Sequence, residues 1–281
     1  MAELLDPRTI RELAAAIDLK PTKQRGQNFV TDANTVRRIV TLADVNADDV
    51  VWEVGPGLGS LTLGLLASGA EVTAVEIDAK LAGLLPQTVA NLQPEAAERL
   101  RVVESDALLV TQLPGPAPTK LVANLPYNVA VPVLLHMLQL SADWRSGFVM
   151  VQLEVADRVV AKPGSKVYGV PSVKLAWYAE ASRVGTVPPK VFWPVPNVDS
   201  GLVKIVRRDP PGDEDLRRRV FLLVDAAFNQ RRKMLRAALA GEFGGSAAAS
   251  EALTAAAIDP TARGEMLTID DFVRLARVGE Q

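Results

Sequence analysis

The segment from Val50 to Ser60, VVWEVGPGLGS, constrains the fold more than any other part of the sequence. A short apolar run passes through closely spaced glycines into a second apolar run that begins at Leu61. A buried strand that turns through glycines into a helix is typical of the first βαβ unit of a nucleotide-binding sheet. The next apolar run ends at Glu76, where a carboxylate can accept hydrogen bonds from both hydroxyls of a ribose. The sequence therefore predicts an adenosine-containing ligand at the edge of a parallel sheet.

The spacing of the glycines separates two classes of cofactor. A dinucleotide fingerprint, G-x-G-x-x-G, would place its third glycine at position 60, where this chain has Ser60. The pattern present is Gly55-x-Gly57-x-Gly59, preceded by the acid Glu53. S-adenosylmethionine (SAM) has no pyrophosphate, so it does not need the phosphate-binding helix terminus of the dinucleotide pattern. We therefore expect SAM, with Gly55 and Gly57 in its binding loop. Glu53 would hold either this loop or the methionine amine, and we favour the supporting role.

The composition bounds the class of protein. Apolar residues make up 48% of the 281 residues, enough for a large core. The chain has no cysteine, which excludes disulfides, thiolate zinc sites and a cysteine nucleophile, and we expect no metal. No apolar run reaches the roughly 18 residues of a membrane span, and the N-terminal segment lacks the apolar core of a signal peptide. We expect a cytoplasmic protein without a membrane partner.

The charges are unevenly distributed, although the net charge is only −2. Residues 41–130 hold eleven acids and four bases, whereas residues 201–240 hold ten bases and five acids. A second group of bases lies at Lys20, Lys23, Arg25, Arg37 and Arg38. An acidic ligand-binding half flanked by basic segments fits a polyanionic partner such as a nucleic acid. Each cluster taken alone is also what an ordinary solvated helix face would show.

Strand-like and helix-like segments alternate along the first two-thirds of the chain. We predict strands near residues 50–54, 71–76, 100–104, 119–123, 146–153, 173–179 and 201–206. We predict helices near residues 1–20, 33–42, 58–68, 79–91, 130–140 and 154–160. This rhythm indicates an α/β fold with a parallel sheet, helices on both of its faces and an antiparallel pair at its edge. A linker-like stretch, DPPGD at 209–213, divides a domain of residues 1–206, with N-terminal helices and a cofactor lid in residues 1–45, from a helical domain of residues 207–281.

The tetrapeptide Asn124-Leu125-Pro126-Tyr127 follows the fourth predicted strand and is the most informative motif in the chain. The exocyclic amine of adenine is a poor nucleophile because its lone pair is delocalised into the ring. The side-chain oxygen of Asn124 and the backbone carbonyl of Leu125 or Pro126 can accept its two N–H groups, which favours a pyramidal nitrogen aimed at a methyl donor. Tyr127 can stack on a base that has left its helix. Asp106, at the end of the third strand, can accept from the amine of the cofactor's adenine.

Seven motifs, in the same order, resemble those of the ribosomal RNA adenine dimethyltransferases, whose bacterial members modify 16S rRNA. They are GQNFV at 26–30, EVGPGLGSLT at 53–62, VEID at 75–78, SDAL at 105–108, NLPYNVA at 124–130, VFWPVPNVDS at 191–200 and FNQRRKML at 228–235. The resemblance implies a class I SAM-dependent methyltransferase fold with a seven-stranded, mostly parallel sheet and a small all-helical C-terminal domain that binds rRNA. It also implies dimethylation at N6 of two adjacent adenosines in the 3′-terminal hairpin of 16S rRNA, late in the biogenesis of the small subunit.

The resemblance also implies roles for individual residues. The implied cofactor-binding residues are Asn28, Val30, Gly55, Gly57, Glu76, Asp106 and Asn124. The implied catalytic residues are Asn124, Leu125, Pro126, Tyr127 and Phe192, with the two aromatic rings enclosing the target base. The implied RNA-binding residues are Arg231, Arg232 and Lys233. The partner would be 16S rRNA in an immature 30S subunit, bound by a monomer. Val30 stands where the family is expected to have leucine.

Three alternatives stay open on the sequence. A 23S rRNA adenine N6-methyltransferase of the macrolide-resistance type shares the fold and the tetrapeptide, although the form of GQNFV and VFWPVPNVDS favours the 16S enzyme. A DNA adenine methyltransferase commonly carries Asp or Asn followed by Pro-Pro-Tyr, unlike this chain. A non-catalytic ribosome assembly factor that binds SAM is disfavoured as a sole role by the intact tetrapeptide.

Overall fold

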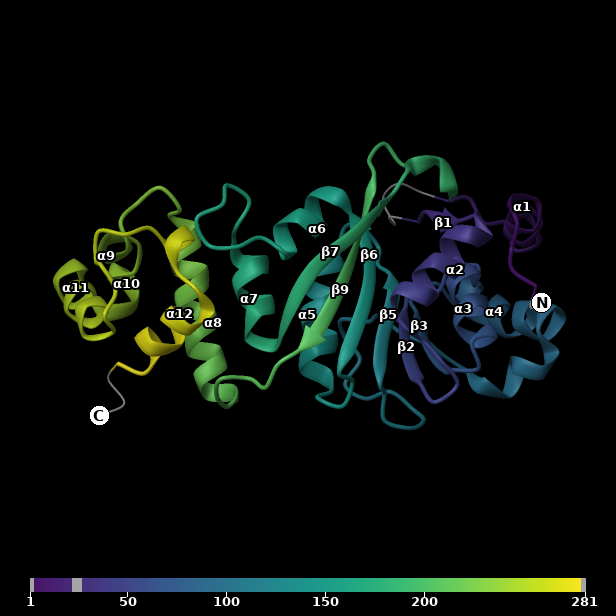
Figure 1. Cartoon of the computed structure of the whole chain (residues 1–281), viewed down its shortest axis with the longest axis horizontal. Helices are drawn as coiled ribbons and strands as arrows, with labels where there is room; N and C mark the ends of the chain where they lie inside the picture. The colour runs from purple at the N-terminus through teal and green to yellow at the C-terminus, as the bar shows by residue number, and fades with distance from the viewer. Residues whose placement is uncertain (1–2, 22–26, 279–281) are drawn as a thin grey trace. The chain divides into compact units, whose positions relative to one another are not determined.

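The computed structural model of the chain describes residues 3–21 and 27–278. Gly26 of the GQNFV motif and the bases Lys23 and Arg25 lie outside the described residues. The contacts divide the chain into two compact units, residues 1–156 with 182–206 and residues 157–181 with 207–281 (Figure 1). Residues 157–181, which we expected in the first domain, therefore cluster with the C-terminal residues.

A seven-stranded sheet runs through the first unit in the order β4-β3-β2-β5-β6-β9-β7. Its strands are β2 (Val50–Val54), β3 (Glu71–Glu76), β4 (Leu100–Glu104), β5 (Lys120–Asn124), β6 (Ser146–Gln152), β7 (Ala179–Val187) and β9 (Ser200–Arg207). The pairs from β4 to β6 are parallel, and β9 is antiparallel to β6. The chain passes outward from β2 to β4 and then returns to place β5 on the other side of β2. Ligands of such sheets bind at the carboxyl ends of the strands beside this switch point.

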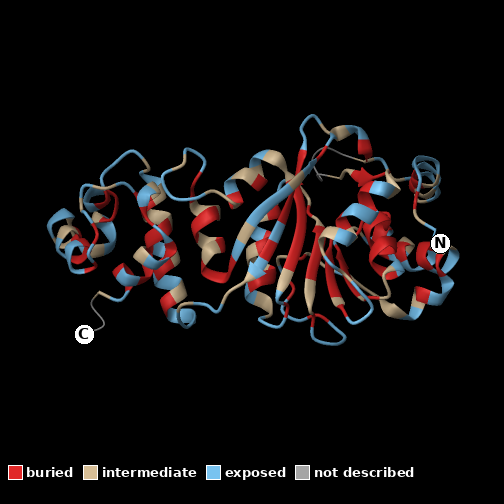
Figure 2. Ribbon diagram, viewed as in Figure 1, coloured by how far each residue is buried: buried red, intermediate tan, exposed pale blue. Residues whose placement is uncertain are grey.

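Helices connect the strands and complete the core of the first unit. They are α1 (Pro7–Ala16), α2 (Ala33–Leu42), α3 (Ser60–Ala67), α4 (Ala79–Leu92), α5 (Ala130–Leu140) and the first residues of α6 (Leu153–Val159). The central strands are buried, as Figure 2 shows, and α3 is buried along almost its whole length. The carboxylate of Asp32 caps α2 by accepting from the Thr35 backbone N–H at 2.8 Å. None of the helices in the described residues is both long enough and apolar enough to cross a bilayer.

The predicted strand at residues 173–179 is wrong. Residues Val170–Tyr178 form the helix α7, and strand β7 begins only at Ala179. Pro171 stands in the first turn of α7, a position that suits proline because the N–H there has no partner within the helix. Several sides of α7 are buried, and both Trp177 and Tyr178 pack edge-on against Phe221. Apolar residues on several sides of a helix do not repeat at the spacing of an amphipathic helix, which explains the error.

The second unit is mostly helical. Besides α7 it contains α8 (Glu214–Asn229), α9 (Leu235–Ala238), α10 (Ala240–Phe243), α11 (Ser246–Ala255) and α12 (Ile269–Ala276). Asp213 caps α8 by accepting from the Leu216 backbone N–H at 2.9 Å, and Thr268 and Asp271 form a reciprocal capping box at α12. Phe272 is fully buried on α12, which packs beside α8. Buried residues of α8 and α12 thus give the second unit a hydrophobic interior.

Candidate active site

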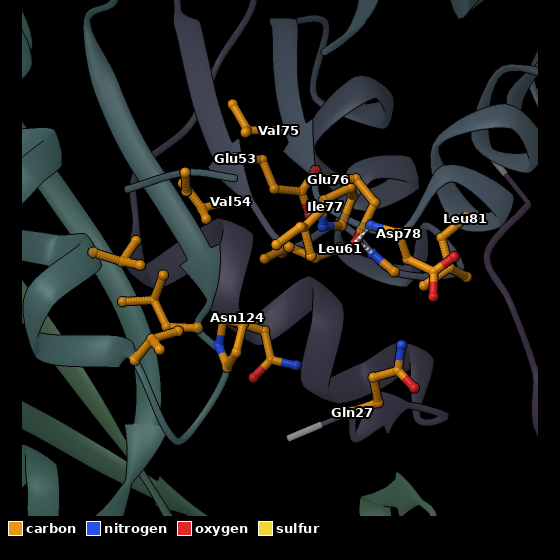
Figure 3. Close-up of a pocket in the computed structure, with 18 of the residues that line it drawn as sticks. Gln27, Glu53, Val54, Leu61, Val75, Glu76, Ile77, Asp78, Leu81 and Asn124 are labelled. Atoms are coloured by element: carbon orange, nitrogen blue, oxygen red, sulfur yellow. Dashed lines mark hydrogen bonds between the residues drawn. The ribbon is translucent and has the colours of Figure 1, made fainter. Parts of the chain in front are cut away.

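A cavity of about 550 Å³ lies in the first unit at the carboxyl ends of β2, β3, β4 and β5. Its walls come from the segments that follow these strands and from residues 27–30. Glu53 and Glu76 lie side by side on one wall, and Asn124 lies on another (Figure 3). The predicted cofactor residues thus meet where the strand order reverses.

Two glycines of the loop lie close to other residues of the cavity wall, Gly57 to Phe29 and Gly55 to Pro126. Gly57 has a positive φ of 59°, and a Cβ atom there would lie 2.8 Å from the ring of Phe29. Gly55 also has a positive φ, of 70°, and a Cβ atom there would lie 3.5 Å from the ring of Pro126. Any other residue at position 57 would strain the turn and displace Phe29. Glycine is therefore required where the loop, the lid and the tetrapeptide approach one another.

Glu76 is held in place by backbone donors at the end of β3. Its side chain is only 6% exposed, and its two oxygens accept from the Gly57 N–H at 3.1 Å and the Asp78 N–H at 3.0 Å. Burial raises the pKa of Glu76, and these hydrogen bonds oppose the shift. Each carboxylate oxygen has two lone pairs, so both retain the capacity to accept from a further donor. This arrangement fits the diol of a ribose.

Glu53 has a different environment from Glu76. It is 1% exposed and accepts from the Thr62 hydroxyl at 2.7 Å. Burial raises the pKa of Glu53 to about 8, and the nearby charge of Glu76 acts in the same direction. Since Thr62 lies in the first turn of α3, the contact links the end of β2 to the helix behind the glycine loop. Of the two roles considered for Glu53, the structure contains the contact that supports the loop.

Asp106 lies on the cavity wall after β4, as predicted, and its carboxylate accepts from the Leu108 N–H at 2.9 Å. The sequence did not single out Ile77, which also lines the cavity and is 68% exposed. An exposed apolar side chain next to Glu76 provides a flat surface for a planar ring. The VEID motif contained this signal, because an apolar residue between two acids at a strand end has no core to enter. Glu76 can bind a ribose, Asp106 can accept from an adenine amine, and Ile77 offers an apolar surface to the adenine ring. Together these three groups fit the adenosine of SAM.

The amide group of Asn124 has a defined orientation at the end of β5. Its Nδ2 donates to the backbone carbonyl of Asn28 at 3.2 Å. The amide nitrogen is thereby engaged, and Oδ1 is left as the acceptor that the predicted chemistry requires. The turn is anchored further by the Leu125 N–H, which donates to the Met150 carbonyl at 3.0 Å. The carbonyl of Pro126 already accepts from the Val129 N–H at 3.2 Å.

The two aromatic residues predicted to enclose the target base lie in different places. Tyr127 lines the cavity, and its hydroxyl lies 2.9 Å from the Ser200 hydroxyl. Phe192 is only 2% exposed, packs in the hydrophobic core and does not belong to the cavity wall. It is buried because it stands opposite Val30 in a strand pair. Phe29, which the sequence did not single out, lines the cavity instead.

This strand pair includes residues 29–30 of the segment 1–45, in which we expected a cofactor lid, and we call the pair the lid. Strand β1 (Phe29–Val30) pairs antiparallel with β8 (Phe192–Trp193), and the Thr31 N–H donates to the Val191 carbonyl at 2.8 Å. The Ser60 hydroxyl donates to the Val30 carbonyl at 2.6 Å. The residue that interrupts the dinucleotide fingerprint therefore fastens the lid to the start of α3.

The three predicted RNA-binding residues differ in their contacts within the second unit. Arg231 bridges to Glu265 at 3.0 Å and donates to the Lys166 carbonyl at 2.7 Å. Arg232 and Lys233 are exposed, and neither has an ion pair among the described residues. Arg231 thus holds two loops of its own unit, whereas its two neighbours point their charges into solvent.

Comparison with known proteins agrees with this geometry. The family model for ribosomal RNA adenine dimethylase matches residues 19–280. The chain is 69% identical over 277 residues to ribosomal RNA small subunit methyltransferase A of Cutibacterium acnes, covering 97% of this chain and 93% of that protein. It is 64% identical over 274 residues to the protein of the same name from Streptomyces coelicolor, covering 97% and 96%.

Two solved structures share the fold. A dimethyladenosine transferase from Plasmodium falciparum has a TM-score of 0.72 at 21% identity, covering 88% of this chain and 95% of that one. The 23S rRNA methyltransferase ErmE has a TM-score of 0.64 at 26% identity, covering 90% and 100%. The α/β fold with its mostly parallel seven-stranded sheet is therefore that of class I SAM-dependent methyltransferases, as predicted. The chain belongs to the ribosomal RNA adenine dimethylase family and is a SAM-dependent methyltransferase.

Proposed function

We propose that the enzyme transfers methyl groups from SAM to N6 of two adjacent adenosines in the 3′-terminal hairpin of 16S rRNA, and that it dimethylates each of them late in small-subunit assembly. The orientation of Asn124 is the observation that carries this proposal. Its Nδ2 is engaged by the Asn28 carbonyl, so Oδ1 is the atom that accepts from an adenine amine. The names of the relatives at 64% and 69% identity support the small-subunit RNA as the substrate.

In this proposal, different residues of the cavity bind the cofactor and position the target base. Glu76 and Asp106 bind the adenosine part of the cofactor, and Gly55 and Gly57 let it lie against the loop. Bound SAM supplies a methyl group that its sulfonium already activates, so no general base is needed before attack. Asn124 Oδ1 and a backbone carbonyl of the turn accept from the two N–H groups of the target amine, which localises its lone pair. Tyr127 holds the base by stacking. Catalysis then depends on positioning and on fixed dipoles.

We also propose how the enzyme meets its substrate. Arg232 and Lys233 bind RNA phosphates, because both are exposed cations without an ion pair in the described part of the chain. In this proposal a monomer acts on the immature 30S subunit in the cytoplasm. The 23S-directed enzyme is the alternative, since ErmE shares the fold.

Methyl transfer to competing substrates tests the proposal. Labelled SAM is incubated with the enzyme and undermethylated 30S subunits, undermethylated 50S subunits or naked DNA, and the nucleosides are analysed. We expect dimethyladenosine with 30S subunits alone. Label in 50S subunits would identify the 23S-directed alternative. Tight SAM binding without label in any substrate would indicate a role in assembly only.

Replacing Asn124 tests the mechanism. Asn124→Ala removes the oriented acceptor, and we expect turnover to fall by at least ~100-fold, the usual effect of losing a key transition-state hydrogen bond. Asn91→Ala is the matched control, because Asn91 is exposed on α4 away from the cavity and its loss should leave turnover unchanged. Near-normal methylation by Asn124→Ala would contradict the mechanism.

A further inference from the structure

The hydroxyl of Tyr127 meets a residue that has no assigned role. Ser200 Oγ lies 2.9 Å from Tyr127 Oη, although the two residues are 73 positions apart. Ser200 is fully buried at the first position of β9, where it stands opposite Gln152 of β6. The contact with Tyr127 is the side-chain hydrogen bond that the structure shows for Ser200 among the described residues. A rigid sheet strand therefore holds the outer end of a side chain on the cavity wall.

Further contacts connect this pair, through the 191–200 segment and β1, back to Asn124 of the same tetrapeptide. Ser200 ends the 191–200 segment, and the beginning of that segment contains β8, which pairs with β1. The residue before β1 is Asn28, whose carbonyl orients the amide of Asn124. Asn124 and Tyr127 are three positions apart, and each is held from outside the tetrapeptide: Asn124 by the residue before β1, and Tyr127 by the last residue of the 191–200 segment. If the tetrapeptide turn moved away from these segments, the bond from Asn124 to the Asn28 carbonyl or the bond between Tyr127 and Ser200 would break.

We propose that Ser200 is a positioning residue for methyl transfer. Its hydroxyl fixes the Tyr127 ring in the orientation against which the target adenine stacks. Through Ser200, the 191–200 segment thereby fixes the position of the residue that stacks on the target base. This inference rests on the proposed role of Tyr127 as the stacking residue. Burial raises the pKa of Tyr127, so the phenol remains a neutral partner for the serine hydroxyl across the working pH range.

Removing either hydroxyl should have the same effect. Ser200→Ala and Tyr127→Phe each delete one partner of the bond and keep the aromatic ring. We expect each to lower kcat/KM for undermethylated 30S subunits by roughly 3- to 10-fold, the value of one hydrogen bond. The affinity for SAM, measured by calorimetry, should not change, because neither Ser200 nor Tyr127 is a predicted cofactor-binding residue. Ser68→Ala is the matched control: it removes a serine hydroxyl bond to the Leu65 carbonyl at the far end of α3.

A double-mutant cycle separates positioning from a purely structural effect. If Ser200 acts through Tyr127, Ser200→Ala should cause no further loss of kcat/KM in the Tyr127→Phe background. A full further loss there would overturn the inference, because Ser200 would then act by another route. An unchanged kcat/KM in Ser200→Ala would overturn it as well, provided that Tyr127→Ala lowers activity. Unchanged activity in Tyr127→Ala would instead overturn the proposed stacking role of Tyr127.

Discussion

Two buried carboxyl groups stand side by side in the cavity, and their hydrogen-bond partners distinguish their roles. Glu76 accepts from two backbone N–H groups, which are fixed donors at the end of a strand. Glu53 accepts from a single hydroxyl, that of Thr62, and has the stronger raised pKa of about 8. A carboxyl group with one weak donor and no cation is most stable when it is protonated. Glu76 thus presents oxygens that fixed backbone donors hold in place for a ligand, and Glu53 is a neutral support near pH 7.

The raised pKa of Glu53 predicts how stability depends on pH. The folded protein retains the proton up to about pH 8, whereas the unfolded chain releases it near the ordinary glutamate pKa of 4.5. The folded state therefore binds more protons between these values, and its free energy of unfolding falls as the pH rises through this window. At 1.36 kcal/mol per pKa unit, the loss is on the order of 5 kcal/mol.

Glu53→Gln mimics the protonated side chain and should remove this loss. Urea unfolding of both proteins from pH 5 to pH 9 measures the difference. We expect the variant to become more stable than the wild type as the pH rises, with little difference at pH 5. Parallel profiles would show that Glu53 is ionised in the folded protein.

At the residue level the sequence predicted the polar residues of the cavity wall better than the residues of the 191–200 segment that pack behind it. Glu76, Asp106 and Asn124 could be found because an acid or an amide directly after an apolar strand must lie at the carboxyl edge of the sheet. Phe192 and Ser200 belong to one motif, yet the motif does not say which member faces the cavity. That depends on the pairing of β8 with β1, a contact between segments about 160 residues apart.

At the level of elements, the shortest ones depend most on tertiary contacts. Strands β1 and β8 have two residues each, too few for any alternation of apolar and polar side chains. They form because the ring of Phe29 fits against Gly57 and stacks on Trp193, with 6.2 Å between the ring centroids. The central strands could be predicted because each is a continuous apolar run. Helix α7 could not, because it is buried on several sides.

Gly57→Ala tests the fit between the lid and the glycine loop. The new methyl group would lie 2.8 Å from the Phe29 ring, at a φ of +59° that alanine rarely adopts. We expect weaker SAM binding and a loss of stability of about 1–2 kcal/mol, measured by calorimetry and urea unfolding. Gly83→Ala is the control, because a Cβ there has no neighbour within 4 Å. It should keep SAM affinity and raise stability by about 0.5–1 kcal/mol. Normal SAM binding by Gly57→Ala would show that the lid yields without cost.

At the scale of the whole molecule, the linker-like composition of residues 209–213 does not reveal which elements share a core. Residues 157–181 lie before β9 and before most of β7 in sequence, yet they cluster with the C-terminal helices. Lys174 of α7 bridges to Asp225 of α8 at 2.8 Å, and Phe221 receives the rings of Trp177 and Tyr178. Such long-range pairing leaves no mark on local composition, so the sequence does not reveal the partners of α7.

The uneven charge distribution predicts that cofactor and RNA are bound by different parts of the chain. The cavity carries acids, whereas Arg232 and Lys233 are exposed cations of the second unit. If both contact phosphates, Arg232→Gln and Lys233→Gln should each weaken binding to undermethylated 30S subunits. Each should also reduce the slope of log K against log salt by about 1, because one fewer counterion is released. SAM affinity should stay the same in both variants.

Arg231→Gln is the matched control for this measurement, because it removes an adjacent charge that is already bound to Glu265 and to the Lys166 carbonyl. We expect it to lower the stability of the enzyme by about 1 kcal/mol, the value of the lost hydrogen bonds, and to leave the salt slope unchanged. A slope reduced as much as in Arg232→Gln would mean that Arg231 leaves Glu265 to bind a phosphate. An unchanged slope in all three variants would place the RNA-binding surface outside this turn, and the bases at positions 20–38 would be the next to replace.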